Sequence, residues 1–554
     1  MMTHTHPLMR SSLLAAALLA AFAAHAQQAP DAGRTLQETA PRTLEAPRLA
    51  PRLDLAPPQE AAVLPGGPSV TLTRITITGN TVFTEAELLA LLGDYRGRSY
   101  DLAGLKALAR RITEHYRAQG YPFARAVLKA QKIEGGVLAI EIIEGRYGKV
   151  EAQGEMAEEA QAFLEALKPG EVISAAPLER ATLILSDQPG IRVRPLLRPG
   201  QEVGAGDLIV EVGREPTLKG EVGLDNHGNR FSGQNRLRAN VQADSPFLLG
   251  DQIKAQALVS DEGLWQGSLG YSLPLGASGL RGGLSYAHTY YELGKDFKNL
   301  KARGTADVAG LNLAYPLIRS QAANLILVAG YQHKALEDRQ DATSTRNDKS
   351  SDLAPLALQF NRRDGSGLTY GTLAYTAGQL DLDAVLEAAD IASGRDTRGH
   401  FDKWNLDLAR LQTTPLSNLT LFGRLSAQWA GKNLDSSERF LLGGATGVRA
   451  YPQGEGLGDE GWLLQLEARY RLGAFEPYLF YDAGAVRVNA KPDGITPAVA
   501  DNHRLISGAG LGLRLASGPW NLDAAIAWRN QGGQPQSDSQ DHNPRAWLAA
   551  SWRF

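Results

Sequence analysis

One arginine and one aspartate are the residues whose chemistry the sequence points to first. Arg449 lies in the glycine-rich stretch 443–461 (GGATGVRAYPQGEGLGDEG), directly after Val448 and close to Tyr451. Asp482 follows in the stretch 480–484 (FYDAG), just before Gly484. A guanidinium group can hold a carboxylate through two parallel N–H···O bonds. We therefore predict that Arg449 binds Asp482, and that Val448, Tyr451 and Gly484 belong to the same contact.

The chain offers little for catalysis or metal chemistry. The sequence holds no G-x-S-x-G, H-E-x-x-H or G-x-x-x-x-G-K-[ST] motif. It has no cysteine, so a disulfide framework and a thiolate metal site are impossible. His115 follows Glu114 on a predicted helix, where a surface pair is far commoner than a metal ligand. We predict no enzyme, metal or cofactor, and the formal charge of −3 shows no nucleic-acid footprint.

The elements that must position this pair read as strands of a membrane barrel. From residue 216 onward, apolar and polar residues alternate between turns, as in the stretch 464–472 (LQLEARYRL) and in the stretches 236–243 and 509–515. This period of two puts one face on lipid and the other on a polar lumen. No segment after the N-terminus has about eighteen consecutive apolar residues, so a membrane form must cross as a closed barrel. At about 20 residues per strand and loop, residues 216–554 give about 16 strands, since even counts are the rule.

A soluble β-sandwich would also alternate, but its inner faces would be the apolar ones. We predict instead that 443–461 folds into a hydrated lumen. The polar set facing that lumen is Arg236, Arg238, Glu467, Arg469, Arg471 and Arg514. In such a wet environment the Arg449–Asp482 pair is expected to contribute only about 1 kcal/mol.

The N-terminal region reads as a secretory signal followed by a linker. Residues 1–26 combine Arg10, the short apolar run 11–24 and an A-x-A cleavage site, and this pattern is preferred over a membrane anchor. Residues 27–68 are rich in Pro, Ala and Arg, a composition typical of a linker. Residues 34–39 can form a short helix before Pro41 stops it, although a plain spacer is favoured.

Two α/β modules are predicted between the linker and the barrel. Residues 69–147 show the order strand, helix, helix, strand, strand, with a capping box at 84–87 and an apolar helix face formed by Leu102, Leu105, Leu108, Ile112 and Tyr116. Residues 148–215 repeat this order more loosely.

The stretch 120–146 (GYPFARAVLKAQKIEGGVLAIEIIEGR) closely resembles the first POTRA domain of two-partner secretion transporters. Further matches are 224–228 (LDNHG), 246–251 (PFLLGD), 315–320 (YPLIRS) and the two stretches around Arg449 and Asp482. The resemblance implies two periplasmic POTRA domains, a 16-stranded barrel in the bacterial outer membrane and the inward latch loop 443–461. It also makes the short helix in the linker 27–68 a candidate plug of the pore. It departs from the family at Ala450, where glycine is usual, which questions the loop-tip geometry.

The resemblance also implies partners. These are a secreted exoprotein (a haemagglutinin, haemolysin or toxin), outer-membrane lipid and the barrel-assembly machinery, which would read Trp552 and Phe554 as an assembly signal; an ordinary interfacial aromatic is the alternative for Phe554. The exoprotein is expected to bind the POTRA domains unfolded and to pass through the lumen. Two other functions stay open: an outer-membrane barrel insertase of the same superfamily, which has more POTRA repeats, and a passive porin, which needs no residues 69–215.

Overall fold

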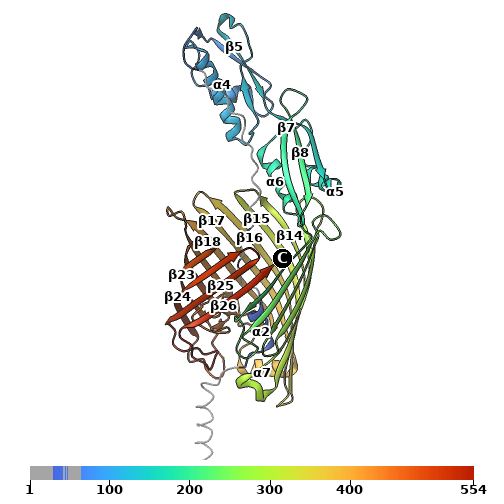
Figure 1. Ribbon diagram of the computed structural model, residues 1–554, viewed down its shortest axis with the longest axis vertical. Helices are drawn as coiled ribbons and strands as arrows, with labels where there is room; N and C mark the ends of the chain where they lie inside the picture. Colours follow the sequence, from blue (N-terminus) through green and yellow to red (C-terminus); the bar gives the residue numbers. More distant parts are fainter. Residues whose placement is uncertain (1–28, 41–43, 45, 48–63) are drawn as a thin grey trace, which may run out of the picture.

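The computed structural model describes residues 29–40, 44, 46–47 and 64–554. The predicted signal peptide 1–26 and most of the predicted linker lie outside this part of the chain. Two α/β modules stand one after the other above one end of a large barrel (Figure 1). We call that end the module-side end and the opposite one the distal end. Among the described residues, no helix is long and apolar enough to cross a membrane.

The first module packs helices on a three-stranded sheet of order β2-β5-β4. Its elements are β1 (Val70–Thr71), β2 (Arg74–Thr78), α3 (Glu85–Ala90), β3 (Ser99–Tyr100), α4 (Leu102–Ala118), β4 (Arg125–Val127), a 3-10 turn η1 (Glu134–Gly136) and β5 (Val137–Ile143). Thr84 and Glu87 form the predicted capping box of α3. Helix α4 buries Leu105, Leu108, Ile112 and Tyr116 as expected, but Leu102 is exposed because it begins the helix, beyond the sheet.

The second module has the same order of elements and a sheet of order β6-β8-β7. It comprises β6 (Arg146–Gly154), α5 (Ala157–Gln161), a 3-10 turn η2 (Ala162–Leu164), α6 (Ala175–Ser186), β7 (Ile191–Pro199) and β8 (Ala205–Arg214). Its helices and sheet enclose a separate apolar core.

Contacts to the barrel turns fix this second module. Arg319 holds both carboxylate oxygens of Asp187 at 2.6 Å. Arg180 donates to the Pro316 carbonyl at 2.9 Å. The side chain of Leu249, in another turn, is buried in the module's core. The second module is therefore mounted on the barrel wall beside the opening.

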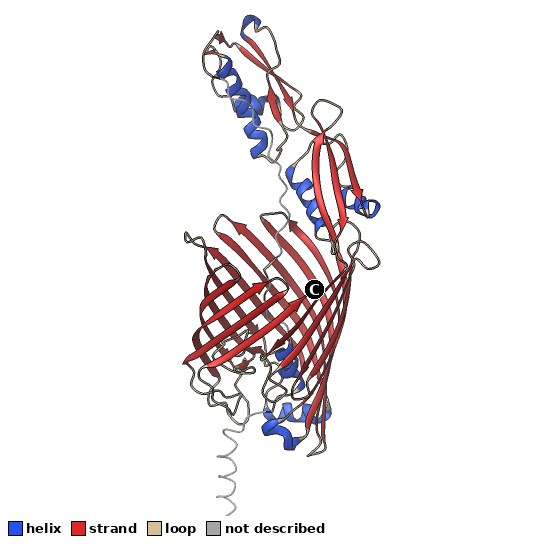
Figure 2. Cartoon of the chain, in the orientation of Figure 1, coloured by secondary structure: helices blue, strands red, loops and turns tan. Residues whose placement is uncertain are grey.

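The barrel has sixteen antiparallel strands and closes on itself, which confirms the predicted fold and strand number. The strands are β9 (Leu218–Asp225), β10 (Arg236–Asp244), β11 (Gln252–Ser260), β12 (Trp265–Pro274), β13 (Arg281–Glu292), β14 (Ala302–Arg319), β15 (Ala323–Gln340), β16 (Thr345–Asp364), β17 (Gly367–Leu382), β18 (Gly399–Thr413), β19 (Leu419–Ala430), β22 (Glu460–Tyr470), β23 (Phe475–Arg487), β24 (His503–Ser517), β25 (Trp520–Gln531) and β26 (Arg545–Arg553). Figure 2 shows them as a tilted wall. At the distal end lie α7 (Ala384–Ser393) and the 3-10 turn η3 (Lys295–Leu300).

The alternating pattern decides which face of each strand meets lipid. In β22, Leu466 and Tyr470 are exposed on the outer face, whereas Gln465 and Glu467 are buried inside. The same alternation exposes Leu237 on β10. An outer surface of leucines around a polar interior is the arrangement of a transmembrane barrel.

Helix α2 (Ala32–Thr39) lies inside the barrel, beside β13, β14 and β15 (Figure 1). The preference for a plain spacer is therefore wrong for these residues. Asp31 caps the helix by accepting from the Arg34 amide at 2.8 Å, and Ala32 is packed in a cluster with Phe231 and Leu336. A helix this short gains most of its stability from tertiary packing, and the wall that provides it is remote in sequence.

Candidate functional site

The loop that carries Arg449 fills part of the barrel lumen. It connects β19 to β22 and contains a 3-10 turn, η4 (Ser436–Glu438), and a small hairpin of β20 (Phe440–Leu441) and β21 (Leu457–Gly458). Its apolar side chains Leu442, Val448 and Tyr451 are buried against the inner faces of β22 to β25. The loop is thus packed against the wall like a small core.

Arg449 reaches Asp482 on β23 through two side-chain bonds. Its Nε donates to Oδ2 at 2.8 Å and its Nη2 donates to Oδ1 at 2.7 Å. The Arg449 amide also donates to Asp482 Oδ2 at 3.1 Å. The predicted pair is therefore present in the bidentate geometry that a guanidinium and a carboxylate favour.

Glu467 on β22 is a second acid for the same arginine, which the sequence did not assign to it. Arg449 Nη1 donates to Glu467 Oε1 at 2.6 Å, and Arg469 and Arg514 also reach Glu467, at 2.8 and 3.1 Å. The guanidinium carbon lies 3.6 Å from the centre of the Phe480 ring, a cation–π contact. On the paired strands β22 and β23, Glu467 is directly opposite Phe480 and lies two residues from the position opposite Asp482. Pairing the two predicted strands in this register would therefore have placed Glu467 near the Arg449–Asp482 contact.

The prediction that this pair lies in a wet environment is wrong. Asp482 has 0% of its surface exposed and Arg449 has 5%. Trp547, on β26, covers the loop and donates from Nε1 to the Arg449 carbonyl at 2.7 Å. Because both charges are buried and fully bonded, removing either one leaves an uncompensated charge, and the cost rises to about 3–5 kcal/mol.

The other predicted members of the contact hold the loop by packing. The Tyr451 hydroxyl donates toward the carbonyls of Gln531 and Gly533, each at 2.9 Å. Val448 is fully buried. A Cβ at Gly484 would lie 2.6 Å from Leu442, so this position needs glycine.

Ala450 does not disturb the loop tip. Its backbone φ is not positive, so the alanine has no conformational penalty there. Its methyl group packs on Gly508, where a Cβ would come within 2.3 Å. The departure from the usual family glycine is accommodated by a glycine on the facing strand.

A second set of buried charges, which we call the lysine anchor, ties helix α2 and the loop to the opposite wall. Lys349 Nζ on β16 contacts Asp31 at 3.1 Å and Asp435 at 2.8 Å. Asp31 Oδ2 also accepts from Ser436 Oγ at 2.6 Å. One wall lysine therefore joins an acid from the helix cap to an acid from the loop. No pattern in the sequence indicates this set, because its members lie on three segments remote from one another.

Two further wall lysines hold the same loop turn. Lys334 Nζ lies 2.5 Å from Glu438 Oε1, and Lys403 Nζ lies 2.9 Å from Glu438 Oε2. Glu438 and both lysines are buried. The turn η4 is therefore fixed between β15 and β18.

Helix α2 and the loop also touch directly. A Cβ at Gly33 would lie 2.3 Å from Ser436 Oγ, which is too close for any other residue type. Arg34 Nη2 donates to the Gly454 carbonyl at 3.1 Å. The helix is thus seated in a socket made jointly by wall and loop.

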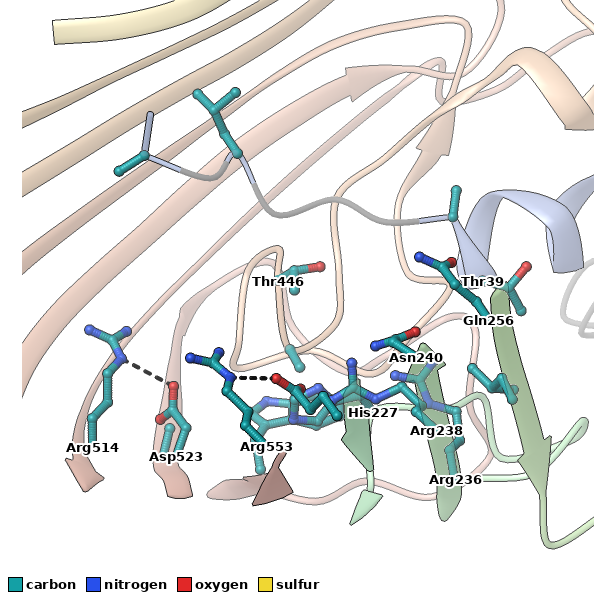
Figure 3. Close-up of a pocket in the computed structure, with 18 of the residues that line it drawn as sticks. Thr39, His227, Arg236, Arg238, Asn240, Gln256, Thr446, Arg514, Asp523 and Arg553 are labelled. Carbon is teal, nitrogen blue, oxygen red and sulfur yellow. Dashed lines mark hydrogen bonds and ion pairs between the residues drawn. The ribbon is translucent and has the colours of Figure 1, made fainter. Parts of the chain in front are cut away.

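On the module side of the helix and loop, the lumen holds a cavity of about 1270 Å³. Figure 3 shows Arg236 and Arg238 from β10, and Arg514 bonded to Asp523. Basic side chains outnumber acidic ones in the lining, and amides such as Asn240 and Gln256 add uncharged polar groups. The prediction that Arg471 faces the lumen is wrong. Its side chain is 76% exposed, because β22 ends at Tyr470 and the chain leaves the wall there.

Trp552 and Phe554 lie at the seam where the barrel closes. Their rings stack at 5.2 Å, and Trp552 is paired with Val222 of β9. The Phe554 backbone exchanges two 3.0 Å hydrogen bonds with Gly220. Their role as an assembly signal stays a prediction.

A buried carboxylate in the first module controls its junction with the second. Glu144 accepts from the amides of Thr81 and Val82 at 2.6 and 2.8 Å, and from Arg146 at 2.9 Å. Burial pushes the pKa of Glu144 up, but these hydrogen bonds outweigh it and leave the pKa below its usual value. Burial, together with the bond to Glu144, raises the pKa of Tyr116 well above its usual range. This carboxylate is ionised at neutral pH and serves as a structural hub.

Within the described part of the chain, no three His, Cys, Asp or Glu side chains are placed to hold a metal ion. The absence of enzymatic activity and of a cofactor stays a prediction.

Comparison with known proteins identifies the architecture. A family model described as "Haemolysin secretion/activation protein ShlB/FhaC/HecB" matches residues 204–515, and a model of the ShlB-type POTRA domain matches residues 70–145. The heme/hemopexin transporter protein HuxB of Haemophilus influenzae is 28% identical over 476 residues, or 83% of each chain. The outer membrane transporter CdiB of Escherichia coli is 26% identical over 459 residues, covering 81% of this chain and 76% of that one.

A solved structure of CdiB from Escherichia coli shares the fold, with a TM-score of 0.73, 20% identity and full coverage of both chains. The family match spans more than half of the sequence and agrees with the closed barrel and the module before it. The chain therefore belongs to the haemolysin secretion/activation family ShlB/FhaC/HecB, and it is an outer-membrane transporter of two-partner secretion with a periplasmic POTRA domain.

Proposed function

We propose that the two modules receive the secreted exoprotein as an extended, unfolded chain, and that residues 148–215 form a second POTRA domain. The sheets of the modules end in unpaired edges, β2 and β4 in the first and β6 and β7 in the second. An extended chain can add to such an edge as a further strand. The second module is mounted beside the barrel opening by Arg319 and Asp187, so a chain held on its sheet lies near the lumen.

The observation that carries the proposed route is the polar cavity inside the barrel. Its walls offer guanidinium, carboxylate and amide groups, and an unfolded chain needs such partners for its backbone. The modules lie at one end of the barrel, and the other end faces the cell surface. We propose that the chain moves from the modules through this lumen to the outside.

We further propose that α2 and the loop 443–461 close the lumen at rest. The helix is held by the lysine anchor, and the loop is held by Arg449, Asp482 and Glu467. Passage of a chain requires the helix to leave its socket. The Arg449 contact acts as the latch that keeps the loop packed on the wall.

Co-expression with a candidate exoprotein from a neighbouring gene tests the proposed function. We expect the exoprotein on the cell surface only when this protein is present, and loss of export in both Arg449→Ala and Asp482→Ala. Equal export without this protein would refute the transport role. Normal export by both variants would leave transport intact and refute the latch.

We also propose that the barrel-assembly machinery reads Trp552 and Phe554. Phe554 is half exposed at the seam, where its ring stacks on Trp552. Deleting Phe554 should reduce the amount of heat-modifiable, folded barrel in the membrane, whereas Phe475→Ala, an exposed aromatic at the same end, should not. Unchanged assembly of the deletion would sink the signal role.

A further inference from the structure

Two identical side-chain units lie on the outer wall of the barrel, away from the lumen site. In the first, His288 Nδ1 contacts Asp307 Oδ1 at 2.7 Å, and the Tyr286 hydroxyl donates to the same oxygen. In the second, His333 Nδ1 contacts Asp352 Oδ1 at 2.8 Å, and Tyr331 donates to that oxygen. We call these the Tyr-His-Asp units. They repeat at equal sequence spacing, 286 to 331, 288 to 333 and 307 to 352.

Strand pairing places both units on four adjacent strands. His288 on β13 is directly opposite Asp307 on β14, and His333 on β15 is directly opposite Asp352 on β16. The neighbours of these residues along each strand face inward: Thr289 and Ser351 are buried in the barrel interior. The units therefore face outward, toward the membrane.

Both units lie where the apolar outer surface ends. On β14 the outward residues Leu311, Leu313 and Tyr315 are exposed toward the module-side end, and Asp307 is the first acidic residue beyond them. On β16 the same change occurs between Leu356 and Asp352. The rings of Trp265 and His288 are 4.9 Å apart, and tryptophan is typical of the membrane–water boundary. The units therefore mark the boundary with the outer leaflet, where lipid headgroups begin.

The chemistry of each unit leaves one atom free. A carboxylate can only accept, so each histidine must donate from Nδ1, and the aspartate fixes the ring orientation. The remaining ring atom, Nε2, has no hydrogen-bond partner in the described part of the chain. In the protonated ring Nε2 carries a hydrogen and is a donor for an anion. The anion found at this depth of a membrane is a headgroup phosphate.

We propose that the two Tyr-His-Asp units bind the phosphate of a phosphorylated lipid in the outer leaflet of the outer membrane. The occupant follows from continuity with the lipid-facing wall and from the match between an Nε2–H donor and a phosphate oxygen acceptor. Two donors on adjacent hairpins suit the two phosphates of one headgroup or one phosphate on each of two lipids. This lipid contact fixes the height of β13 to β16 in the membrane, the strands that also pack around helix α2 or carry Lys349.

Native mass spectrometry of the full chain, incubated with bis-phosphorylated lipid A or with the same lipid after removal of its phosphates, tests this proposal. We expect retention of the phosphorylated lipid only, and a drop of at least about fivefold in the double variant His288→Gln and His333→Gln, because a charge-assisted hydrogen bond is lost at each unit. The matched control is His400→Gln with His503→Gln, two exposed histidines whose side chains contact no acidic group in the described part of the chain. Heat modifiability on a gel confirms that all variants are folded.

Three results would overturn the proposal. The first is equal retention of both lipids. The second is an equal loss of lipid in the control variant. The third is release of the lipid by a chelator, which would assign the contact to a divalent cation bridging the aspartates and the lipid instead of to the histidines.

Discussion

The loop in the lumen is held at two places that use opposite arrangements of charge. At the first, the loop provides the cation, Arg449, and strands β22 and β23 provide the acids Glu467 and Asp482. At the lysine anchor the arrangement is reversed: the wall provides the cation, Lys349. The acids are Asp31 from the helix cap and Asp435 from the loop. Both sites are buried, so each is costly to break.

The difference suggests an order of events in opening. The Arg449 contact involves the loop alone, whereas Lys349 holds helix and loop together. If α2 leaves, Lys349 loses Asp31 but keeps Asp435, and Glu438 keeps both of its lysines. The helix can therefore depart at moderate cost while the loop stays, whereas displacing the loop first would expose several unpaired buried charges.

The largest expected effect on stability comes from breaking the contact that Arg449 makes with the acids of the wall. Arg449→Ala leaves Asp482 and Glu467 buried without their main partner, which should lower the free energy of unfolding by about 3–5 kcal/mol. Denaturant unfolding of the full chain, followed by tryptophan fluorescence, measures it. The control Arg471→Ala removes an exposed arginine. Its ion pair, at 3.9 Å, should contribute almost nothing to the free energy of unfolding. Equal destabilisation by both variants would contradict the burial argument.

Breaking the lysine anchor should release the helix more than it unfolds the barrel. Lys349→Met leaves Asp31 and Asp435 facing each other without a cation, so α2 should leave its socket. The chain has no cysteine, so a single Thr35→Cys, a fully buried position on α2, reports the departure by maleimide labelling. We expect labelling at least about tenfold faster, equivalent to about 1.4 kcal/mol. Lys298→Met, at an exposed lysine of the distal turn η3, should leave labelling unchanged.

A finer test separates the two roles of Asp31. Asparagine caps helices as well as aspartate, so Asp31→Asn removes only the ion pair, whereas Asp31→Ala also removes the cap, worth about 1 kcal/mol. The labelling rate of Thr35→Cys should therefore be lowest with the native Asp31, higher in Asp31→Asn and highest in Asp31→Ala. If Thr35→Cys is labelled as fast in the Asp31→Asn variant as in the Lys349→Met variant, then Asp435 does not keep Lys349 in place. The proposed order of events then fails.

An effect of similar size, which appears only as a pH dependence, is expected outside the barrel, in the first module. The pKa of Glu144 is lowered in the fold, so its stabilisation is complete above the unfolded-state pKa of about 4.3 and is lost as the pH falls through the lower folded value. Glu144→Gln should cost about 1–2 kcal/mol at pH 7 and remove this part of the acid dependence. Calorimetry of the full chain from about pH 7 down into the acid range measures it, since this range begins above the unfolded-state pKa and runs toward the lowered folded value.

Glu141→Gln serves as the control for that measurement. Glu141 is on β5, which ends one residue before Glu144, and it forms an ion pair with the exposed Lys129. An acid transition in Glu144→Gln identical to that of the wild type would show that other carboxylates control the junction.

The sequence by itself determined the pattern of the barrel and the identity of its most informative pair. Alternation along 464–470 is a local property, because adjacent residues of a strand face opposite sides whatever the rest of the chain does. Arg449 and Asp482 stood out because each lies in a recognisable stretch. The modules were equally readable, down to the capping box at Thr84 and Glu87.

Only the tertiary structure decided what surrounds these residues. The burial of Asp482, the second acid Glu467 and the joining of Asp31 to Asp435 through Lys349 depend on segments remote in sequence that meet only when the barrel closes. The composition of residues 27–68 indicated a linker, and yet 32–39 form a helix, because the wall and the loop provide contacts that no local pattern encodes. Local sequence sets the direction of a side chain, and the closed fold sets its partners and hence its energy.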